Sequence, residues 1–233
     1  MTRLYDDIKT FFKQQAELFP PEIYLISENG EESTPKTDSA TQLAELERIC
    51  QNCRQCHLSA TRTKVVFGTG NPHAKLLFIG EAPGVNEDLQ GLPFVGRAGN
   101  LLDKMLKAIG LTRAQVYIAN VLKCRPPENR TPNVGEVEKC EPYLLKQIAI
   151  IQPELIICLG LTSAKTLLRV EYTLEKMRGQ IFQYHNVDLI VTYHPAAILR
   201  NENLKKYAWE DFKKITNLYL DKTGEYMALN DGE

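Results

Sequence analysis

The chain has 233 residues, of which 43% are hydrophobic and 24% are charged, with a formal net charge of −1 and six cysteines. These values are typical of a globular protein, and the length suits one α/β core with appendages better than two full domains. No apolar run approaches the roughly 18 residues of a membrane-spanning helix, and Asp6 and Asp7 stand where a signal peptide would be apolar. We therefore expect a soluble, cytoplasmic protein that does not enter a membrane.

The N-terminal part differs from the rest in composition. Residues 2–19 have an amphipathic helical pattern that ends at Pro20-Pro21, and residues 28–42 form a polar, Ser- and Thr-rich stretch. We assign residues 1–42 to an accessory extension with a flexible linker. Residues 1–50 carry a net charge of −5 and residues 221–233 a net charge of −3, which leaves +7 for the central part. A basic centre suits a polyanionic partner, although a surplus of this size also occurs in proteins that bind none.

Strand-like and helical stretches alternate from residue 75 onward. Four short apolar runs have the length of buried strands, and helical periodicity follows them. The alternation predicts βαβ units, and hence an α/β fold of three layers (α/β/α) around a central four-stranded parallel sheet. We assign residues 43–220 to this domain and residues 221–233 to an acidic tail. The predicted strands are 75–79, 116–119, 155–159 and 188–193, and the predicted helices are 43–49, 100–109 with Asn100 as its N-cap, 134–151, 161–169 and 202–220.

Polar residues follow three of these strands directly. Glu81 comes after the first strand, Asn120 after the second and His194 after the fourth. Because the carboxyl ends of parallel strands share one edge of a sheet, we expect these side chains to converge. Taken alone, each of these residues is more simply explained as a polar strand end or a capping residue. Their convergence with Phe94, from the glycine-rich loop 80–99, would instead form a site for a flat ligand.

The cysteines suggest a metal centre. Cys158 lies inside an apolar run and is most simply a small buried hydrophobic residue. Clustered thiols in a reducing compartment indicate metal binding rather than disulfides, with unrelated free thiols as the alternative. Tetrahedral zinc and an iron–sulfur cubane both need four ligands, and spacing does not separate them. The preferred ligands are Cys53, Cys56, Cys124 and Cys140, which leave Cys50 spare.

Several motifs in order resemble those of the iron–sulfur uracil-DNA glycosylases, usually called family 4. The resemblance runs from about Ile49 to Leu220, through CRQCHLSATRTKVVFGTG, GEAPGVNEDLQGLPFVGRAGNLLDKML, NVLKCRPPENRTP, CEPY and HPAAILRN. It implies a [4Fe-4S] cluster on the four preferred cysteines and a three-layer α/β/α fold. It also implies repair of uracil-containing DNA, single- or double-stranded, by excision of the base, and we expect a monomer.

The resemblance and the chemistry of uracil together suggest roles for the converging residues. An extruded uracil would stack on Phe94, and the Asn120 amide would match its N3–H and O4. His194 would donate a hydrogen bond to O2 as negative charge develops there. The backbone at Gly80 and Glu81 would complete the binding site.

The loop after the first strand departs from that of the better-known uracil glycosylases. Ala82 stands where those enzymes have a water-orienting aspartate, and Gly84 stands where they have a tyrosine that blocks the 5-methyl group of thymine. Glu81, Glu87 and Asn129 are the unranked candidates to position water or to brace the loop.

Basic residues near these motifs are candidates to bind DNA. Arg62, Arg125 and Arg130 lie near the preferred cysteines, and we expect them and Arg200 to reach phosphates. Residues 198–200 are expected to fill the gap that the extruded base leaves. Two other classes of function stay open. One is a non-catalytic nucleic-acid-binding module whose fold is stabilised by a metal, and the other is a redox carrier.

Overall fold

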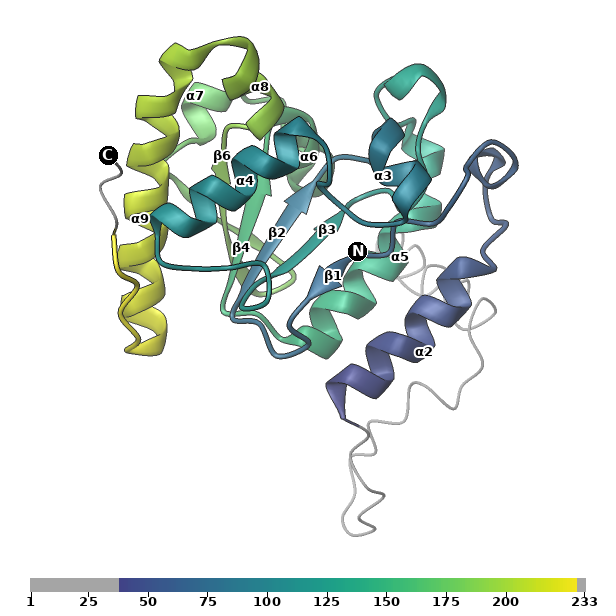
Figure 1. The fold of residues 1–233 in the computed structure, drawn as a ribbon, viewed down its shortest axis with the longest axis horizontal. Helices are drawn as coiled ribbons and strands as arrows, with labels where there is room; N and C mark the ends of the chain where they lie inside the picture. Colours follow the sequence, from purple (N-terminus) through teal and green to yellow (C-terminus); the bar gives the residue numbers. More distant parts are fainter. Residues whose placement is uncertain (1–37, 230–233) are drawn as a thin grey trace, which may run out of the picture. The chain divides into compact units, whose positions relative to one another are not determined.

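A six-stranded sheet forms the centre of the computed structural model, which describes residues 38–229 (Figure 1). The predicted helix at 2–19 and most of the predicted linker lie outside the described residues. The strands lie in the order β1-β3-β2-β4-β6-β5. Their bounds are β1 (Thr69–Gly70), β2 (Leu76–Gly80), β3 (Tyr117–Asn120), β4 (Leu155–Leu159), β5 (Ile181–Tyr184) and β6 (Val187–Thr192).

The four inner strands are parallel, as predicted, and the two edge strands are antiparallel additions. The sheet therefore has six strands rather than four. β1 was not predicted because it has only two residues. β5 is joined to β6 by a hairpin turn at His185 and Asn186, both of which have positive φ. Because the pairing places Gly80 beside Asn120, the ends of β2 and β3 reach the same level.

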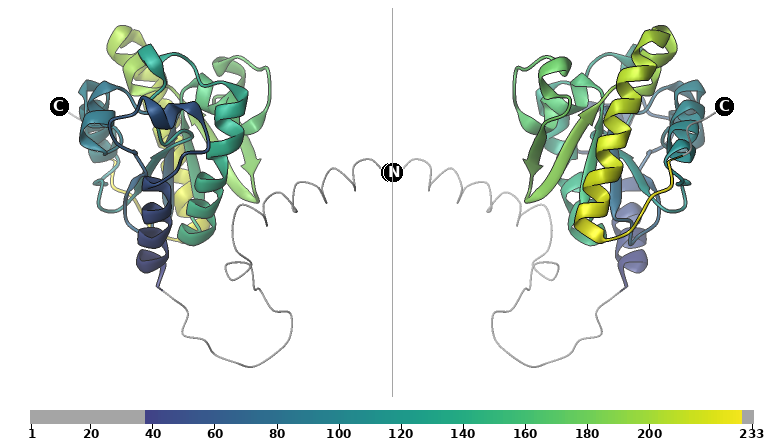
Figure 2. Two further views of the ribbon diagram at one scale, coloured as in Figure 1. Left: turned by 90° about the vertical axis from the view of Figure 1, so that its right-hand side faces the viewer. Right: turned by 90° about the vertical axis from the view of Figure 1, so that its left-hand side faces the viewer.

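Helices cover both faces of the sheet, which gives the three predicted layers (Figures 1 and 2). Side chains alternate along each strand, so every inner strand contributes to two apolar cores. One core lies between the sheet and α2 (Ser39–Gln51), α5 (Val134–Ile151) and α6 (Leu161–Leu168). The other lies between the sheet and α4 (Arg97–Ala108) and α9 (Lys205–Thr223).

Several short helices are absent from the predicted set because they are too short to show periodicity. They lie mostly in connections at the carboxyl edge of the sheet, where they position the site described below. Their bounds are η2 (His57–Ala60), α3 (Val85–Gln90), η3 (Pro127–Asn129), α7 (Leu174–Met177) and α8 (Pro195–Arg200). The predicted helix 202–220 is divided into η4 (Glu202–Leu204) and α9.

Helix α4 begins earlier than predicted, with Gly96 rather than Asn100 as its N-cap. The reason is a contact with a side chain of the preceding helix, α3. The Glu87 carboxylate accepts hydrogen bonds from the backbone N–H groups of Val95 and Gly96, which turns the chain into the helix at that point.

The two ends of the described chain pack onto the domain. α2 begins at Ser39, inside the expected extension, and α9 continues to Thr223, inside the expected acidic tail. Met227 is buried, and Glu225 accepts a hydrogen bond from Lys75 at 2.5 Å. Within residues 38–229, none of the helices combines the length and the apolar composition that crossing a membrane requires.

Candidate functional site

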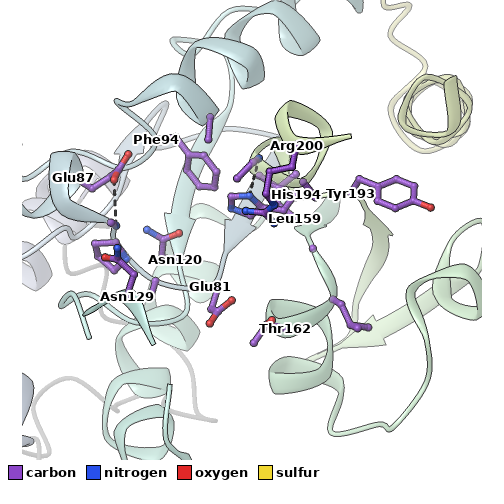
Figure 3. A pocket seen from close by; sticks show the side chains of 18 of the residues that line it. Glu81, Glu87, Phe94, Asn120, Asn129, Leu159, Thr162, Tyr193, His194 and Arg200 are labelled. Carbon is purple, nitrogen blue, oxygen red and sulfur yellow. Dashed lines mark hydrogen bonds between the residues drawn. The ribbon is translucent and has the colours of Figure 1, made fainter. Parts of the chain in front are cut away.

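A cavity of about 650 Å³ opens where the four parallel strands end (Figure 3). Asn120, Phe94 and His194 point towards a common space, although they come from the end of β3 and from the connections after β2 and β6. The expected convergence at the sheet edge is therefore what the structure shows. The lining also contains these other residues singled out in the sequence: Glu81, Glu87, Asn129, Arg130 and Arg200.

Gly80 permits the close approach of the amide and the aromatic ring. Asn120 is only 2% exposed and lies beside Gly80 across the β2–β3 pair. A Cβ atom at position 80 would overlap Asn120 Oδ1 and would lie 2.7 Å from Phe94 Cζ. Only a residue without a side chain therefore allows both groups to face the cavity here.

Phe94 has a strained backbone that is fixed from outside the loop. Its φ of 53° is in the left-handed region, which is uncommon for an aromatic residue. The Arg113 guanidinium donates hydrogen bonds to the carbonyl groups of Pro93, at 3.0 Å, and Phe94. The Phe94 ring lies 5.5 Å from the His194 ring, centroid to centroid, at an interplanar angle of 30°. Arg113 was not among the residues identified from the sequence, because it lies 19 residues from Phe94 with no local signal.

His194 is held as a neutral hydrogen-bond donor. It is the N-cap of α8, and its Nδ1 accepts a hydrogen bond from the Ala196 N–H at 3.1 Å. Burial, and secondarily the positive charge of Arg200, lower the pKa of His194 to about 4, while Glu87 opposes this shift. Because Nδ1 is an acceptor, the neutral ring carries its proton on Nε2.

The carboxylates of Glu87 and Glu81 have different surroundings. The Glu87 carboxylate accepts three backbone hydrogen bonds, from Gly84 at 3.1 Å, Val95 at 3.0 Å and Gly96 at 3.2 Å. It therefore clamps both ends of the segment between β2 and α4. Glu81 is half-buried on the cavity wall, and burial raises its pKa, with the hydroxyl of Thr162 opposing the shift.

Asn129 lines the same cavity from the segment after β3. Its backbone has a φ of 54°, and its side-chain Oδ1 accepts a hydrogen bond from Arg125 Nε at 2.7 Å. Arg125 thus orients an amide of the cavity wall, although it is not itself part of the lining.

The other arginines that were predicted to contact DNA differ in whether their guanidinium groups are already bound within the protein. Arg200 is exposed at the cavity rim. Arg130 also lines the cavity, but its guanidinium binds both oxygens of the buried Glu136, at 3.0 and 2.5 Å. Arg62 lies at the cysteines, where it donates hydrogen bonds to Cys124 Sγ at 3.2 Å and to the Cys53 carbonyl at 2.8 Å.

The expected wedge at residues 198–200 is wrong for Ile198. That side chain is 2% exposed and packs with Tyr193 and Ala208, so it cannot enter DNA. Leu199, which is 39% exposed, is the apolar residue of this segment that faces solvent.

A second, narrower cavity gathers five cysteines from three segments of the chain. The segments are the end of α2 with the loop after it, the connection after β3, and α5. Two sulfur atoms accept hydrogen bonds, Cys140 from the Lys123 N–H at 3.2 Å and Cys124 from Arg62. Among residues 38–229, no three His, Cys, Asp or Glu side chains are arranged to hold a single metal ion. The cysteines that line this cavity are Cys50, Cys53, Cys56, Cys124 and Cys140.

Cys158 is separate from this group. It is buried in β4, and its thiol donates to Ser163 Oγ at 3.3 Å, as expected of a small core residue. The donor set of the five other cysteines fits a thiolate-bound metal cluster, because all five line one cavity and two of their sulfur atoms accept hydrogen bonds from backbone and guanidinium N–H groups.

Lys123 connects the two cavities and was missed by the sequence interpretation. It is 1% exposed, and its Nζ donates to the Asn120 carbonyl at 2.8 Å and to Gln147 Oε1 at 2.6 Å. Burial lowers the pKa of Lys123 to about 8, and the neighbouring thiols oppose this shift. The sequence shows only one lysine after Val121 and Leu122 and before Cys124, and its burial becomes evident in the structure.

Comparison with known proteins gives consistent matches. The model of the uracil DNA glycosylase superfamily matches residues 67–213. The type-4 uracil-DNA glycosylase of Archaeoglobus fulgidus is 46% identical over 184 residues, which cover 76% of this chain and 92% of the relative. The protein of the same name from Sulfurisphaera tokodaii is 49% identical over 178 residues, covering 72% and 81%. That from Thermotoga maritima is 41% identical over 182 residues, covering 76% and 94%.

Proposed function

The chain belongs to the uracil DNA glycosylase superfamily, and on this basis we propose that it is a uracil-DNA glycosylase. The enzyme would extrude uracil from DNA and hydrolyse its N-glycosidic bond, leaving an abasic site for repair. The observation that carries this proposal is the single cavity that brings together an amide, an aromatic ring and a neutral imidazole. We infer a monomeric, cytoplasmic enzyme that accepts uracil in single- or double-stranded DNA.

Binding begins with extrusion of the base, which costs a few kcal/mol of unstacking and unpairing. Stacking on Phe94 returns part of this cost, because base–aromatic contacts contribute roughly 1–3 kcal/mol. The buried Asn120 amide offers an acceptor to N3–H and a donor to O4. Cytosine presents the opposite pattern at these atoms, so it would leave buried polar groups facing like groups, which is strongly unfavourable.

His194 acts on the departing base. Cleavage leaves negative charge on uracil, and the Nε2–H of the neutral ring donates a hydrogen bond to O2 where that charge develops. The low pKa of His194 means that it stabilises the anion by this hydrogen bond rather than by transferring a proton. Backbone groups at Gly80 and Glu81 border the same space.

Water is positioned by Glu81 or Asn129, which both line the cavity. Glu87 has a different part, since its carboxylate is occupied by three backbone N–H groups. It braces the loop that carries Phe94. Cleavage through an oxocarbenium-like sugar needs modest nucleophilic help once the leaving group is stabilised, so the alanine at position 82 is compatible with activity.

A [4Fe-4S] cluster on Cys53, Cys56, Cys124 and Cys140 is the proposed cofactor. Its support is the convergence of the thiols and the similarity to type-4 enzymes. When bound, the cluster cross-links the segments that carry its ligands and holds them in place beside the DNA. Arg200 at the rim is the best-placed of the predicted arginines to bind phosphate, whereas Arg62, Arg125 and Arg130 support the loops.

The test is a glycosylase assay on a single-stranded oligonucleotide with one uracil, followed by alkali. We expect cleavage at uracil and none at cytosine in the same position. Asn120→Ala and His194→Ala should each slow excision by about 10²–10³, the effect of removing one oxyanion-type contact. The exposed Asn203→Ala is the matched control and should behave as the wild type.

Failure of the wild type to produce abasic sites, with binding of the oligonucleotide retained, would contradict the proposal and favour the non-catalytic module. Reversible electron transfer without excision would instead favour the redox carrier. Full activity of Asn120→Ala would remove the proposed mechanism.

A further inference from the structure

Lys123 places an ammonium group inside the protein without a carboxylate partner. Its Nζ is bound by two neutral oxygens, the Asn120 carbonyl and Gln147 Oε1, and lies 5.9 Å from the centroid of the Phe67 ring. Within residues 38–229, no carboxylate is in ion-pair distance of it. A buried charge is costly unless an opposite charge lies near it.

The groups beside Lys123 that can carry negative charge are the cysteines. Lys123 itself lines the cysteine cavity, Cys124 follows it in the chain, and its backbone N–H donates to Cys140 Sγ at 3.2 Å. Four thiolates bring more negative charge than an iron–sulfur core removes, so a bound cluster is a net anion. An anion in this cavity would supply the charge that the ammonium lacks.

The same ammonium also contacts the end of β3, which carries Asn120, the residue proposed to recognise uracil. Asn120 ends β3, and the residues after it are fixed to the neighbouring strand end by bonds from Val121 N to the Gly80 carbonyl and from Leu122 N to the Glu81 carbonyl. The Nζ contact to the Asn120 carbonyl, at 2.8 Å, therefore joins the cysteine cavity to the base-binding cavity through a single side chain.

We propose that Lys123 is the internal counter-ion of the metal centre and the positioning residue that couples this centre to Asn120. This inference depends on the cofactor and the glycosylase activity proposed above. Its physical content is that one buried positive charge stabilises the anionic cluster and holds the carbonyl of Asn120.

The first experiment compares Lys123→Met with Lys139→Met in the iron-loaded protein. Met replaces the lysine side chain with an uncharged one of similar length, and Lys139 is an exposed lysine that lines the same cavity. Electrochemical titration should show that Lys123→Met shifts the one-electron equilibrium against reduction at least about tenfold, which is about 59 mV. Lys139→Met should shift it far less, because solvent screens an exposed charge. Equal potentials for wild type and Lys123→Met would overturn the inference.

A second measurement covers a variant that does not retain iron. After removal of iron by a chelator, Lys123→Met should unfold at a higher temperature than the wild type treated in the same way, because it lacks an unpaired buried charge. With iron bound, the order should reverse. A merely structural hydrogen-bonding role predicts that the variant is less stable in both states, and that result would contradict the counter-ion role.

The coupling to Asn120 is tested by single-turnover excision with iron-loaded protein. Lys123→Met should slow the excision step more than tenfold, whereas Lys139→Met should leave it unchanged. An unchanged rate would remove the positioning role. Wild-type protein that excises uracil without any iron would overturn the inference and leave the glycosylase proposal intact, whereas iron-loaded protein that excises nothing would refute the glycosylase.

Discussion

The two cavities of this protein are built in different ways. The base-binding cavity lies where four parallel strands end, so residues far apart in the chain are brought together by the sheet itself. The cysteine cavity lies beside the sheet and is assembled from a helix end, two connections and a second helix. The first is positioned by the hydrogen-bonded sheet, whereas the segments of the second are joined by contacts of Arg62 and of the Lys123 N–H to the cysteines.

One short segment nevertheless belongs to both cavities. Asn120 lines the first, Cys124 lines the second, and Lys123 contacts groups of both. The comparison therefore shows that the cysteine cavity and Asn120 are joined through Lys123, so that the proposed metal centre would support base recognition without touching the base. The following changes separate the two cavities or test the link between them.

The largest effect is expected from the proposed metal ligands. Cys124→Ala should abolish iron binding, because three remaining ligands leave one iron of the cluster open. Cys50→Ala, which removes the spare thiol from the same cavity, should keep full iron content. Iron analysis and the cluster absorbance measure both. Loss of iron from Cys50→Ala, with retention by Cys124→Ala, would reverse the ligand assignment.

Gly80→Ala should damage the base-binding cavity alone. Its new methyl group would meet Asn120 Oδ1 and Phe94 Cζ, so the amide and the ring must move apart. Displacements of this kind cost about 10²-fold in rate, which a steady-state excision assay detects. Gly135→Ala in α5 is the control: its methyl group would meet nothing within 4 Å, and it should stabilise the helix by up to about 1 kcal/mol. A fully active Gly80→Ala would contradict the described geometry.

The pKa of His194 predicts how stability depends on pH. Burial depresses this pKa to about 4, so between the ordinary value near 6.5 and about 4 the unfolded chain binds a proton that the folded protein does not. The free energy of unfolding is therefore unaffected by the titration of His194 above about pH 6.5, and it decreases as the pH falls below this value because protons bind to the unfolded chain. Relative to His194→Gln, the wild type should lose about 2 kcal/mol of unfolding free energy between about pH 7.5 and pH 5. Denaturant titrations at both pH values measure it, and a constant difference would show an ordinary histidine pKa.

Glu87→Gln should have the smallest effect. A glutamine keeps one acceptor oxygen but replaces the other with an NH₂ group, which cannot accept the bond from Gly84 or from Val95 and Gly96. The loop that carries Phe94 should loosen, and excision should fall about tenfold, mostly through weaker binding of the base. Glu128→Gln, at an exposed residue, is the matched control. A change in iron content would show that the loop and the metal centre are not separable.

Much of the fold could be predicted because its inner strands are continuous apolar runs. Those runs gave the four parallel strands and the meeting of Glu81, Asn120 and His194 at one edge. The edge strands were missed because β1 is too short and β5 is half-exposed, so neither has a strong pattern. The start of α4 was missed because it depends on Glu87, which is in another helix.

Glu87 was a candidate to brace its loop, but two other supporting residues of the site could not be predicted from the sequence. Arg113 fixes the backbone of Phe94, and Gln147 binds the ammonium of Lys123, 24 residues away. These contacts exist only after the sheet and helices have packed, and arginine, glutamine and lysine carry no periodic signal of their own. Arg113 and Gln147 also lie outside the motifs that carry the resemblance, whereas Glu87, Lys123 and Arg125 lie inside them.

The clamp made by Glu87 has a consequence for how this loop can vary. Because the Glu87 carboxylate fixes the chain at Gly84 and again at Val95 and Gly96, the position of Phe94 does not depend on the length of the connection between the end of α3 and Pro93. Leu89, near the end of α3, and Leu92, just after this helix, face solvent. Surface loops lengthen at small entropic cost, about 0.6 kcal/mol per doubling. This connection is thus a place where homologous enzymes can gain or lose residues, and so reshape the surface beside the cavity, without moving Phe94.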